Sequence, residues 1–371
     1  MTSSNPIEMP EHVRSLIPLG DYKWPRSEAE QTIGHLLEKF KMGFGTAKNA
    51  AAIDTGELKK RSDEMLERAL RTVLETVLLD ALSATYLGWA TKGTNSRTKR
   101  LLVHPPMGTD ILSDWAKRHD FPVLSELKQL REKFDVACFV VPSIEVFFGR
   151  HVDQLTPLFD FFEALSAYQG RVLVGCSSWA RRFLWQFDEL QFMLGEGETF
   201  PAFDADALAS VFERALESNA VVKSVATGAP ILKRDDDGNL VDPFLKKLAE
   251  VSLGHPWVAV EMFLQGIAEA ADADEKTSES QLWVQFPAAC SLPTPANDAH
   301  LFALQSLLIH GPRKIEEFDK LLPSPTVKGV WSALQQNGFV DIHDGSVSCA
   351  IRNYPEIRSE LGAAGFNLDR L

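Results

Sequence analysis

The sequence predicts an α/β protein with a doubly wound, mostly parallel sheet, a helical N-terminal region, a helical lid and a C-terminal winged helix. Three observations support this fold class. Between residues 101 and 184, short continuous apolar runs alternate with amphipathic helical patterns, as expected for parallel strands covered on both faces. Helical periodicity prevails before and after that region. Near the end of the sequence, three short helical patterns precede a hairpin pattern, which is the order of elements in winged-helix domains.

Composition limits the classes of function. The 371 residues include 38 basic and 51 acidic side chains, a net charge of −13, which repels nucleic acids and anionic membranes unless a local basic face overrides it. Hydrophobic residues make up 45% of the chain, enough for a core in two or three domains. The four cysteines form no C-x-x-C pair, which indicates a reducing compartment and no zinc site. With no apolar signal segment or membrane-spanning run, a cytoplasmic location is expected.

The first 97 residues are expected to form an arm and helices. Prolines exclude regular helix from residues 1–27, so this arm is expected to order only on contact with a partner. Ser27 and Thr55 are predicted to cap helices that run to Met42 and over residues 57–91. The G-x-G in the loop 43–48 has no strand before it and lacks P-loop spacing, so it is predicted to end a helix.

Residues 98–203 are predicted to form the α/β core, and the remaining chain to be mainly helical. Strands are expected at 101–103, 122–124, 136–141 and 171–174, with helices at 109–118, 125–133 and 153–168 between them. Residues 204–280 are predicted to be a helical lid with a turn at 235–239 and an acidic linker from 269. Residues 297–371 are predicted to form the winged helix, with helices at 300–310, 314–321 and 326–337 and a hairpin over 339–349.

The end of the 171–174 strand carries a G-x-S sequence, which also occurs where hydrolases present a nucleophilic serine. That motif needs small residues on both sides of the serine, and Trp179 occupies the second of these positions, although Gly175 satisfies the first. No histidine follows in a recognisable triad order. Ser177 is therefore predicted not to be a nucleophile, and a serine hydrolase is disfavoured.

Three local stretches resemble the AAA+ and STAND ATPases, especially those of the origin-recognition and transposition-helper type. They are the strand and loop 137–145, the strand and turn 171–178, and the turn Leu253-Gly-His-Pro256 before a helix. The resemblance covers residues 98–355 and implies a phosphate-loop strand, an acidic strand, a sensor strand, a helical lid and a winged helix. In that family, Ser177 would lie at the end of the sensor strand.

The same comparison implies a degenerate nucleotide pocket. The first strand enters a loop with two prolines, no lysine and an added aspartate, and the second strand lacks the aspartate that would hold Mg²⁺, with only Glu145 nearby. We therefore expect no catalytic residue, no cofactor and no metal ligand. The residues of the degenerate pocket are His104, Pro105, Pro106, Met107, Gly108, Thr109, Asp110, Glu145 and Ser177.

The predicted winged helix favours a protein partner over DNA. Its third helix offers only Lys328, Gln335 and Gln336 as contact residues. Residues 297–371 contain seven basic and nine acidic side chains, so their net charge is −2, whereas nucleic-acid modules usually present a basic face.

Together these features predict a non-catalytic pseudo-ATPase scaffold or adaptor in the cytoplasm. Its protein contacts, or a self-association, are expected at the N-terminal region and the winged helix. The alternative is a regulatory nucleotide-binding protein that acts with or on DNA.

Overall fold

A computed structural model describes most of the chain, and it separates into two compact units. The described residues are 8–25, 58–60, 64–92, 98–107, 110–126, 128–129, 137–149, 152–216, 220–270, 281–287, 290, 292, 298–321 and 329–371. Unit 1 comprises residues 1–14, 24–77 and 201–289, and unit 2 comprises residues 15–23, 78–200 and 290–371. The first predicted segment, residues 1–97, is divided between the two units. The chain passes from one unit to the other at 200/201 and at 289/290, close to the boundaries predicted after residue 203 and between residues 280 and 297.

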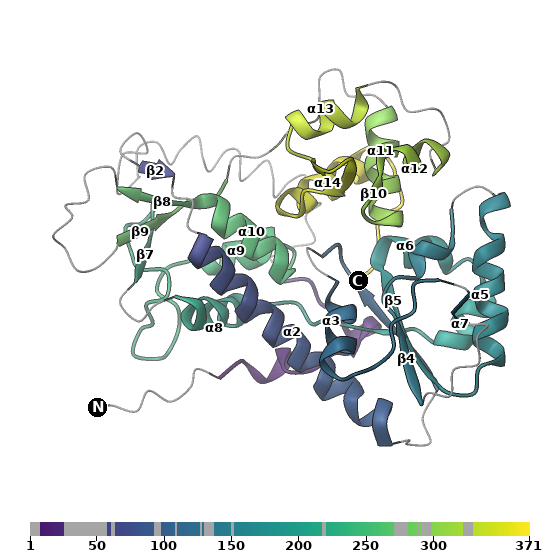
Figure 1. Cartoon of the computed structure of the whole chain (residues 1–371). Helices are drawn as coiled ribbons and strands as arrows, with labels where there is room; N and C mark the ends of the chain where they lie inside the picture. Colours follow the sequence, from purple (N-terminus) through teal and green to yellow (C-terminus); the bar gives the residue numbers. More distant parts are fainter. Residues whose placement is uncertain are drawn as a thin grey trace. The chain divides into compact units, whose positions relative to one another are not determined.

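A five-stranded, mostly parallel sheet forms the centre of unit 2, which confirms the α/β class (Figure 1). The strand order is β1-β6-β3-β5-β4, and only β1 runs antiparallel to its neighbour. An isolated parallel bridge from Val123 to Val140 extends the sheet beyond β4, where the sequence predicted a brief strand. The strands are β1 (Ile17–Pro18), β3 (Lys99–His104), β4 (Cys138–Val141), β5 (Arg171–Ser177) and β6 (Glu198–Thr199).

Helices α3 and α5 lie close to the positions predicted at 109–118 and 153–168. Figure 1 shows α3 and α5 on opposite sides of β4 and β5. The α/β segment contains α3 (Ile111–Arg118), the 3-10 helices η4 (Ile144–Phe147) and η5 (Val152–Gln154), α5 (Thr156–Ala167), α6 (Ser178–Leu184) and α7 (Asp188–Leu194). The predicted helix at 125–133 lies mostly outside the described residues.

Helix α2 (Glu64–Lys92) confirms most of the long helix predicted over 57–91, but residues 58–60 form strand β2 instead of the start of that helix. The residues of α2 are divided between the two units at 77/78. Its second half is fixed in unit 2 by a buried polar group. Tyr86 donates a hydrogen bond to Glu198 at 3.0 Å, and the Arg100 guanidinium pairs with Glu198 while lying 5.2 Å from the Tyr86 ring centroid. Burial, followed by the Glu198 charge, raises the pKa of Tyr86. These contacts join α2 to strands β3 and β6.

The described part of the N-terminal arm, residues 8–25, is packed, which corrects the prediction that the arm orders only on contact. Strand β1 pairs with β6, and the short helices η1 (Glu11–Val13) and η2 (Leu19–Asp21) flank it. The backbone N–H of Leu16 donates to Thr85 Oγ1 at 3.0 Å, and that of Leu19 to the Gly197 carbonyl at 3.1 Å. Its buried side chains are Met9, Val13, Leu16, Leu19 and Tyr22. The prolines exclude a regular α-helix from this segment, but its apolar side chains still pack into the core.

The C-terminal part of unit 2 consists of helices and a small sheet in the order β10-β12-β11. The hairpin β11–β12 turns at Asp344-Gly345, as predicted, with both residues at positive φ. The elements are α11 (Asp298–His310), β10 (Arg313–Lys314), α12 (Ile315–Leu321), α13 (Val330–Gln336), β11 (Val340–His343), β12 (Ser346–Cys349), η6 (Ile351–Asn353) and α14 (Tyr354–Ala363).

Unit 1 contains a second sheet, which the prediction of a mainly helical lid did not include. The order of its strands is β2-β8-β9-β7, with helices α8, α9 and α10 in the same unit. Residues 269 and 270, predicted to begin a linker, belong to strand β8, and residues 271–280 lie outside the described part. The elements are β2 (Leu58–Lys60), α8 (Ala205–Ala215), β7 (Val221–Ser224), α9 (Phe244–Val251), α10 (Pro256–Gly266), β8 (Ile267–Ala270) and β9 (Gln281–Val284).

A turn precedes α10, as predicted for residues 253–256. Helix α10 begins at Pro256, and both Leu253 and Gly254 adopt positive φ. A Cβ on Gly254 would lie 2.6 Å from that of Ala202, so a side chain cannot be placed there without displacement. The predicted helix over 27–42 and the loop at 43–48 lie outside the described residues.

Candidate functional site at the carboxyl edge of the parallel sheet

Strands β3, β4 and β5 all end at one edge of the sheet of unit 2, called here the carboxyl edge. Open α/β sheets bind their ligands outside this edge, where neighbouring connections leave in opposite directions. His104 at the end of β3 is the register partner of Ser177 at the end of β5. The structure thereby brings together the strand ends on which the degenerate pocket was predicted.

The polar groups of the loop after β3 bond to the loop itself and to the first turn of helix α3. His104 is half-buried, and its Nδ1 lies 2.9 Å from the Pro105 carbonyl oxygen. Asp110 caps helix α3, because its carboxylate accepts hydrogen bonds from the Ser113 backbone N–H, at 3.0 Å, and from the Ser113 hydroxyl. Pro105 is buried, Pro106 and Met107 are half-buried, and Gly108 and Thr109 lie outside the described residues.

Glu145 and Ser177 form a direct contact at the carboxyl edge. One carboxylate oxygen of Glu145 accepts a hydrogen bond from the Ser177 backbone N–H, and the other accepts one from the Ser143 hydroxyl. Glu145 is only 2% exposed. Both of its oxygens are therefore engaged by the chain itself.

The Ser177 hydroxyl likewise both accepts and donates a hydrogen bond. It accepts a hydrogen bond from the Ala180 backbone N–H at 3.0 Å, as the N-cap of α6, and lies 3.4 Å from the Leu308 carbonyl, to which it donates. Capping explains why a serine stands at this position in the sequence.

Helix α11 and strand β10 cover the carboxyl edge. Helix α11 packs against α6 and η4. Arg313 donates a hydrogen bond from Nη2 to the Glu145 carbonyl at 2.7 Å, and the rings of Phe148 and His310 lie 5.2 Å apart. The chain's own C-terminal elements thus occupy the surface above Glu145 and Ser177.

A second buried group, called here the Asp369 clasp, joins α6 to α14 and to Asp369 beyond it. Asp369 accepts hydrogen bonds from Ser178 Oγ at 2.6 Å, Tyr354 Oη at 2.9 Å and Arg358 Nε at 2.8 Å. Trp179 Nε1 donates to Tyr354 Oη at 3.1 Å. Burial, together with the Asp369 charge, raises the pKa of Tyr354, so the phenol remains a donor.

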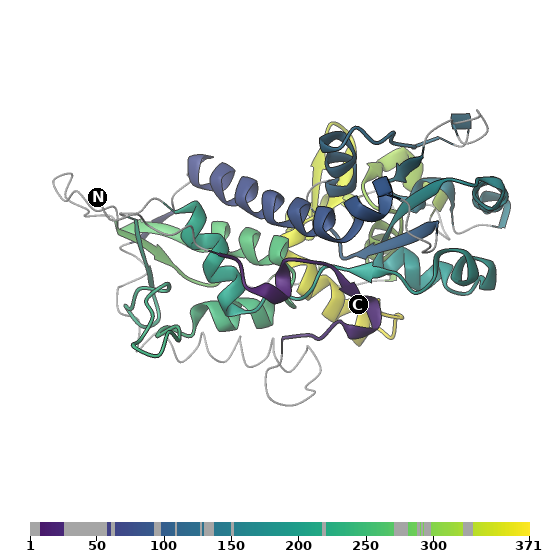
Figure 2. The same ribbon diagram turned by 90° about the horizontal axis from the view of Figure 1, so that it is seen from below.

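The segment before α2 also reaches this clasp. Figure 2 shows the purple segment around η2 beside the point labelled C. Tyr22 of this segment is buried, and its pKa is raised by that burial and by the charge of Asp369. Parts of unit 2 that are far apart in the sequence therefore meet around one buried carboxylate.

Gly175 allows β5 to approach the neighbouring loop. A Cβ at this position would lie 2.0 Å from the Pro142 carbonyl oxygen and 2.5 Å from Leu112 Cδ1. No side chain fits in that space. The next residue, Cys176, is buried, and burial followed by the Glu145 charge raises the pKa of its thiol, so the thiolate is disfavoured.

Sequence reasoning missed the residues of the clasp, since Ser178 and Asp369 are 191 positions apart. The only local signal was the spacing of Tyr354 and Arg358, four residues apart on one helix face. It also missed a contact between Ser83 and His119, whose Oγ and Nε2 lie 2.9 Å apart. The Ser83 hydroxyl donates its proton to the Leu79 carbonyl at 2.8 Å, so this contact joins α2 to α3 without activating a nucleophile.

The predicted contact residues of the C-terminal region are only partly described. Gln335 and Gln336 are exposed on α13, and Lys328 lies outside the described residues. The opposite face of α13 packs inward, where Trp331 lies 5.0 Å from the Phe318 ring.

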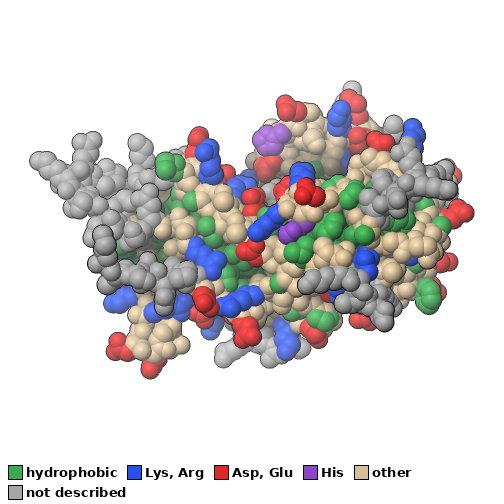
Figure 3. Space-filling view, turned by 60° about the horizontal axis from the view of Figure 1, so that its bottom comes forward, with side chains coloured by type: hydrophobic (Ala, Val, Ile, Leu, Met, Phe, Trp, Pro, Cys, Tyr) green, Lys and Arg blue, Asp and Glu red, His purple; other side chains and the backbone are tan. Residues whose placement is uncertain are grey.

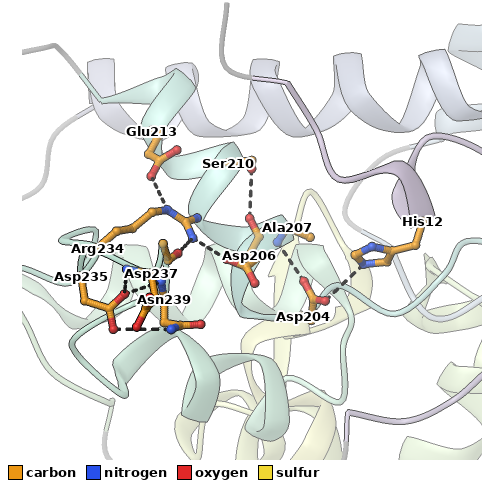
Figure 4. A network of polar contacts seen from close by, with 11 residues as sticks. His12, Asp204, Asp206, Ala207, Ser210, Glu213, Arg234, Asp235, Asp237 and Asn239 are labelled. Atoms are coloured by element: carbon orange, nitrogen blue, oxygen red, sulfur yellow. Dashed lines mark hydrogen bonds and ion pairs between the residues drawn. The ribbon is translucent and has the colours of Figure 1, made fainter.

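A polar network in unit 1 includes the predicted turn at 235–239 (Figure 4). Asp235 Oδ1 accepts hydrogen bonds from the backbone N–H groups of Asp237 at 3.1 Å and Asn239 at 2.8 Å, which confirms the turn. Arg234 Nη1 pairs with Asp206 at 2.6 Å and donates to the Gly238 carbonyl at 2.8 Å. The Asp235 carboxylate is thus bonded to backbone N–H groups and the Asp206 carboxylate to the Arg234 guanidinium, which indicates a structural role for this turn.

The network continues to helix α8. Asp204 caps α8 by accepting from the Ala207 backbone N–H at 2.9 Å, and its other oxygen lies 3.3 Å from His12 Nε2 (Figure 4). Burial raises the pKa of Glu213, opposed by the charge of Arg234. Among the described residues, no group of three or more histidine, cysteine, aspartate or glutamate side chains is arranged to hold a metal ion.

Comparison with known proteins gives no family assignment. No family model matches the chain, and no curated protein matches it significantly. Among solved structures, the chain is similar to Cdc6p from Pyrobaculum aerophilum, with 12% identity, a TM-score of 0.28, and coverage of 86% of this chain and 100% of that one. A likeness at this level supports no inference about function. Within the part of the chain that the structure describes, no helix is long and apolar enough to cross a membrane.

Proposed function

We propose that this protein is a non-catalytic scaffold or adaptor built on a degenerate ATPase-like fold. The observation that carries the proposal is the occupation of the carboxyl edge by the chain itself. Glu145 and Ser177 bond to each other, and Leu308 and Arg313 bond to them from the covering elements. A site in which a nucleotide would otherwise bind is used here to join two parts of one unit.

The chemistry of the strand ends supports this proposal. The loop after β3 contains no lysine to neutralise a γ-phosphate, and Pro105 and Pro106 lack the N–H groups that would contact phosphate oxygens. Asp110 adds a negative charge at the start of α3. A charge-assisted hydrogen bond contributes about 1.5–3 kcal/mol, so loss of the lysine and several amides removes most of the affinity for a triphosphate.

The C-terminal elements support a winged helix that binds protein. Helices α11, α12 and α13 precede the β11–β12 hairpin, and β10 completes its sheet. The net charge of −2 over residues 297–371 opposes binding to a phosphate backbone. On the face of the molecule in Figure 3, basic side chains are interspersed with acidic ones and do not gather in one stripe. All four cysteines are free, as expected for the proposed cytoplasmic location.

Thermal unfolding with and without Mg·ATP tests the proposal. We expect millimolar Mg·ATP to leave the Tm unchanged, because the carboxyl edge is filled. A ligand present at a hundred times its Kd would stabilise the protein by about 2.7 kcal/mol and raise the Tm by several degrees.

The matched control is His104→Asp, which adds a second carboxylate to the loop after β3. A rise in Tm with Mg·ATP in the wild type that disappears in H104D would refute the proposal. Equal rises in both proteins would locate a nucleotide site elsewhere and would refute it as well.

A further inference from the structure

Two phenylalanine side chains are exposed on helices α5 and α7, which pack against each other in unit 2 (Figure 1). Phe192 of α7 is 87% exposed and Phe159 of α5 is 47% exposed. The ring of Phe159 lies 5.7 Å from that of Phe187 and 6.4 Å from that of Phe162. Aromatic surface therefore continues from the core to the solvent.

Folding does not explain the position of Phe192. Helix α7 buries Leu190 and Leu194, which are 1% and 2% exposed, so its core contacts come from these two leucines. Phe192 lies between them in the sequence and points to solvent. Burial of a phenylalanine side chain is worth about 1.5–3 kcal/mol, and this free energy remains available to a partner.

The surroundings of these phenylalanines are acidic. Residues 152–170 and 183–200 contain no lysine or arginine. Glu198 in this range is already paired with Arg100. The exposed acidic residues in the two segments are Asp153, Glu163, Asp188, Glu189 and Glu196. Arg171, Arg181 and Arg182 border the segments, and Glu196 interacts electrostatically with Arg181.

We propose that the α5–α7 surface, defined by Phe159, Phe187, Phe192 and the acidic residues named above, binds a basic amphipathic segment of another protein. An apolar stripe on that segment would cover the rings, and its lysine or arginine side chains would face the carboxylates. The same charge repels a second copy of this surface, an anionic membrane and nucleic acid. The inference extends the proposed scaffold function by giving one partner surface its chemistry.

Fluorescence anisotropy with the full-length protein tests this surface. The probe is a labelled 18-residue helical peptide with leucine at i, i+3, i+4 and i+7 spacing and lysine elsewhere, at about 0.15 M salt, where the Debye length is about 8 Å. A matched peptide with glutamate in place of lysine should not bind. The double variant Phe159→Ser with Phe192→Ser should bind the lysine peptide at least tenfold more weakly than the wild type does.

The control variant is Met65→Ser, which removes another highly exposed apolar side chain, 76% exposed, and should bind within twofold of the wild type. Phe159 is partly packed, so the single variant Phe192→Ser replaces the double variant in the anisotropy measurement if the double variant unfolds. Hydrogen exchange should show protection by the peptide in α5 and α7. Absence of binding to the wild type, equal loss in the control, or protection elsewhere would overturn the inference. Nucleotide is absent throughout, so failure here is separate from failure of the proposed function.

Discussion

At the scale of the residue, Gly175 is a position where one added carbon decides stability. Gly175→Ala is expected to lower the free energy of unfolding by about 1–3 kcal/mol, because its Cβ would meet the rigid Pro142 carbonyl. The matched control is Gly88→Ala in helix α2, where a Cβ meets nothing within 4 Å. That change is expected to stabilise by up to about 1 kcal/mol through helix propensity. Urea unfolding shows whether each variant has a lower or a higher free energy of unfolding than the wild type. A higher value for G175A would contradict the close contact with the Pro142 carbonyl.

His119 gives a residue-scale prediction about pH. Burial, followed by the charge of Arg118, lowers its pKa in the folded protein, and the charge of Asp120 opposes this. The unfolded chain, with a histidine pKa near 6.5, therefore binds a proton more readily as the pH falls. The stability that neutral His119 contributes is present above about pH 6.5 and is lost as the pH falls through the lower folded pKa.

The measurement compares Tm from pH 8 to pH 5 in the wild type and in His119→Gln, which retains a polar side chain without a titration in that range. The difference in Tm between the two proteins should shift in favour of the variant as the pH falls. A constant difference across the range would show that His119 contributes nothing to the pH dependence.

At the scale of the element, residues 15–23 of the proline-containing N-terminal arm are a part of the fold of unit 2. Leu19 is buried beside the β1–β6 pair. Leu19→Ala is expected to cost about 2 kcal/mol, at the lower end for a buried leucine, because η2 is short and near the surface. The exposed Lys23→Ala is the control and should change stability by less than about 0.5 kcal/mol. Chemical denaturation distinguishes the two, and equal effects would contradict a packed arm.

The elements differ in how far the sequence could predict them. Strands β3, β4 and β5 were predictable because each is a continuous apolar run, which only a buried parallel strand requires. Strands β7 and β9 were not, because each is four residues long and its alternation is lost among helical patterns. The site was predictable to the level of Glu145 and Ser177, because Ser177 ends β5 and Glu145 lies in the short η4 helix after β4. Arg313, Tyr354 and Asp369 contact them or their neighbours only through the tertiary fold, and no local pattern marks such a pairing.

At the scale of the whole molecule, each unit is assembled from three separate stretches of chain, and in unit 2 the Asp369 clasp joins two of them. Asp369→Ala should leave Arg358 without its buried partner and cost about 3–5 kcal/mol. Hydrogen exchange in this variant should increase in α6 and α11 together, since the clasp joins α6 to α14 and both of these helices pack against α11. Asp344→Asn, an exposed turn change at positive φ that asparagine tolerates, is the control. Faster exchange in α14 alone would contradict a joint role.

The position of Asp369 in the chain has a consequence for synthesis. Strand β6 is complete when Thr199 leaves the ribosome, so the sheet can form then, but the elements that cover its carboxyl edge are made later. At about 5–20 residues per second, the 170 residues from 199 to 369 take roughly 10–30 s. During that interval Ser178 and Trp179 lack their partners Asp369 and Tyr354, and the carboxyl edge of the nascent sheet stays accessible to chaperones.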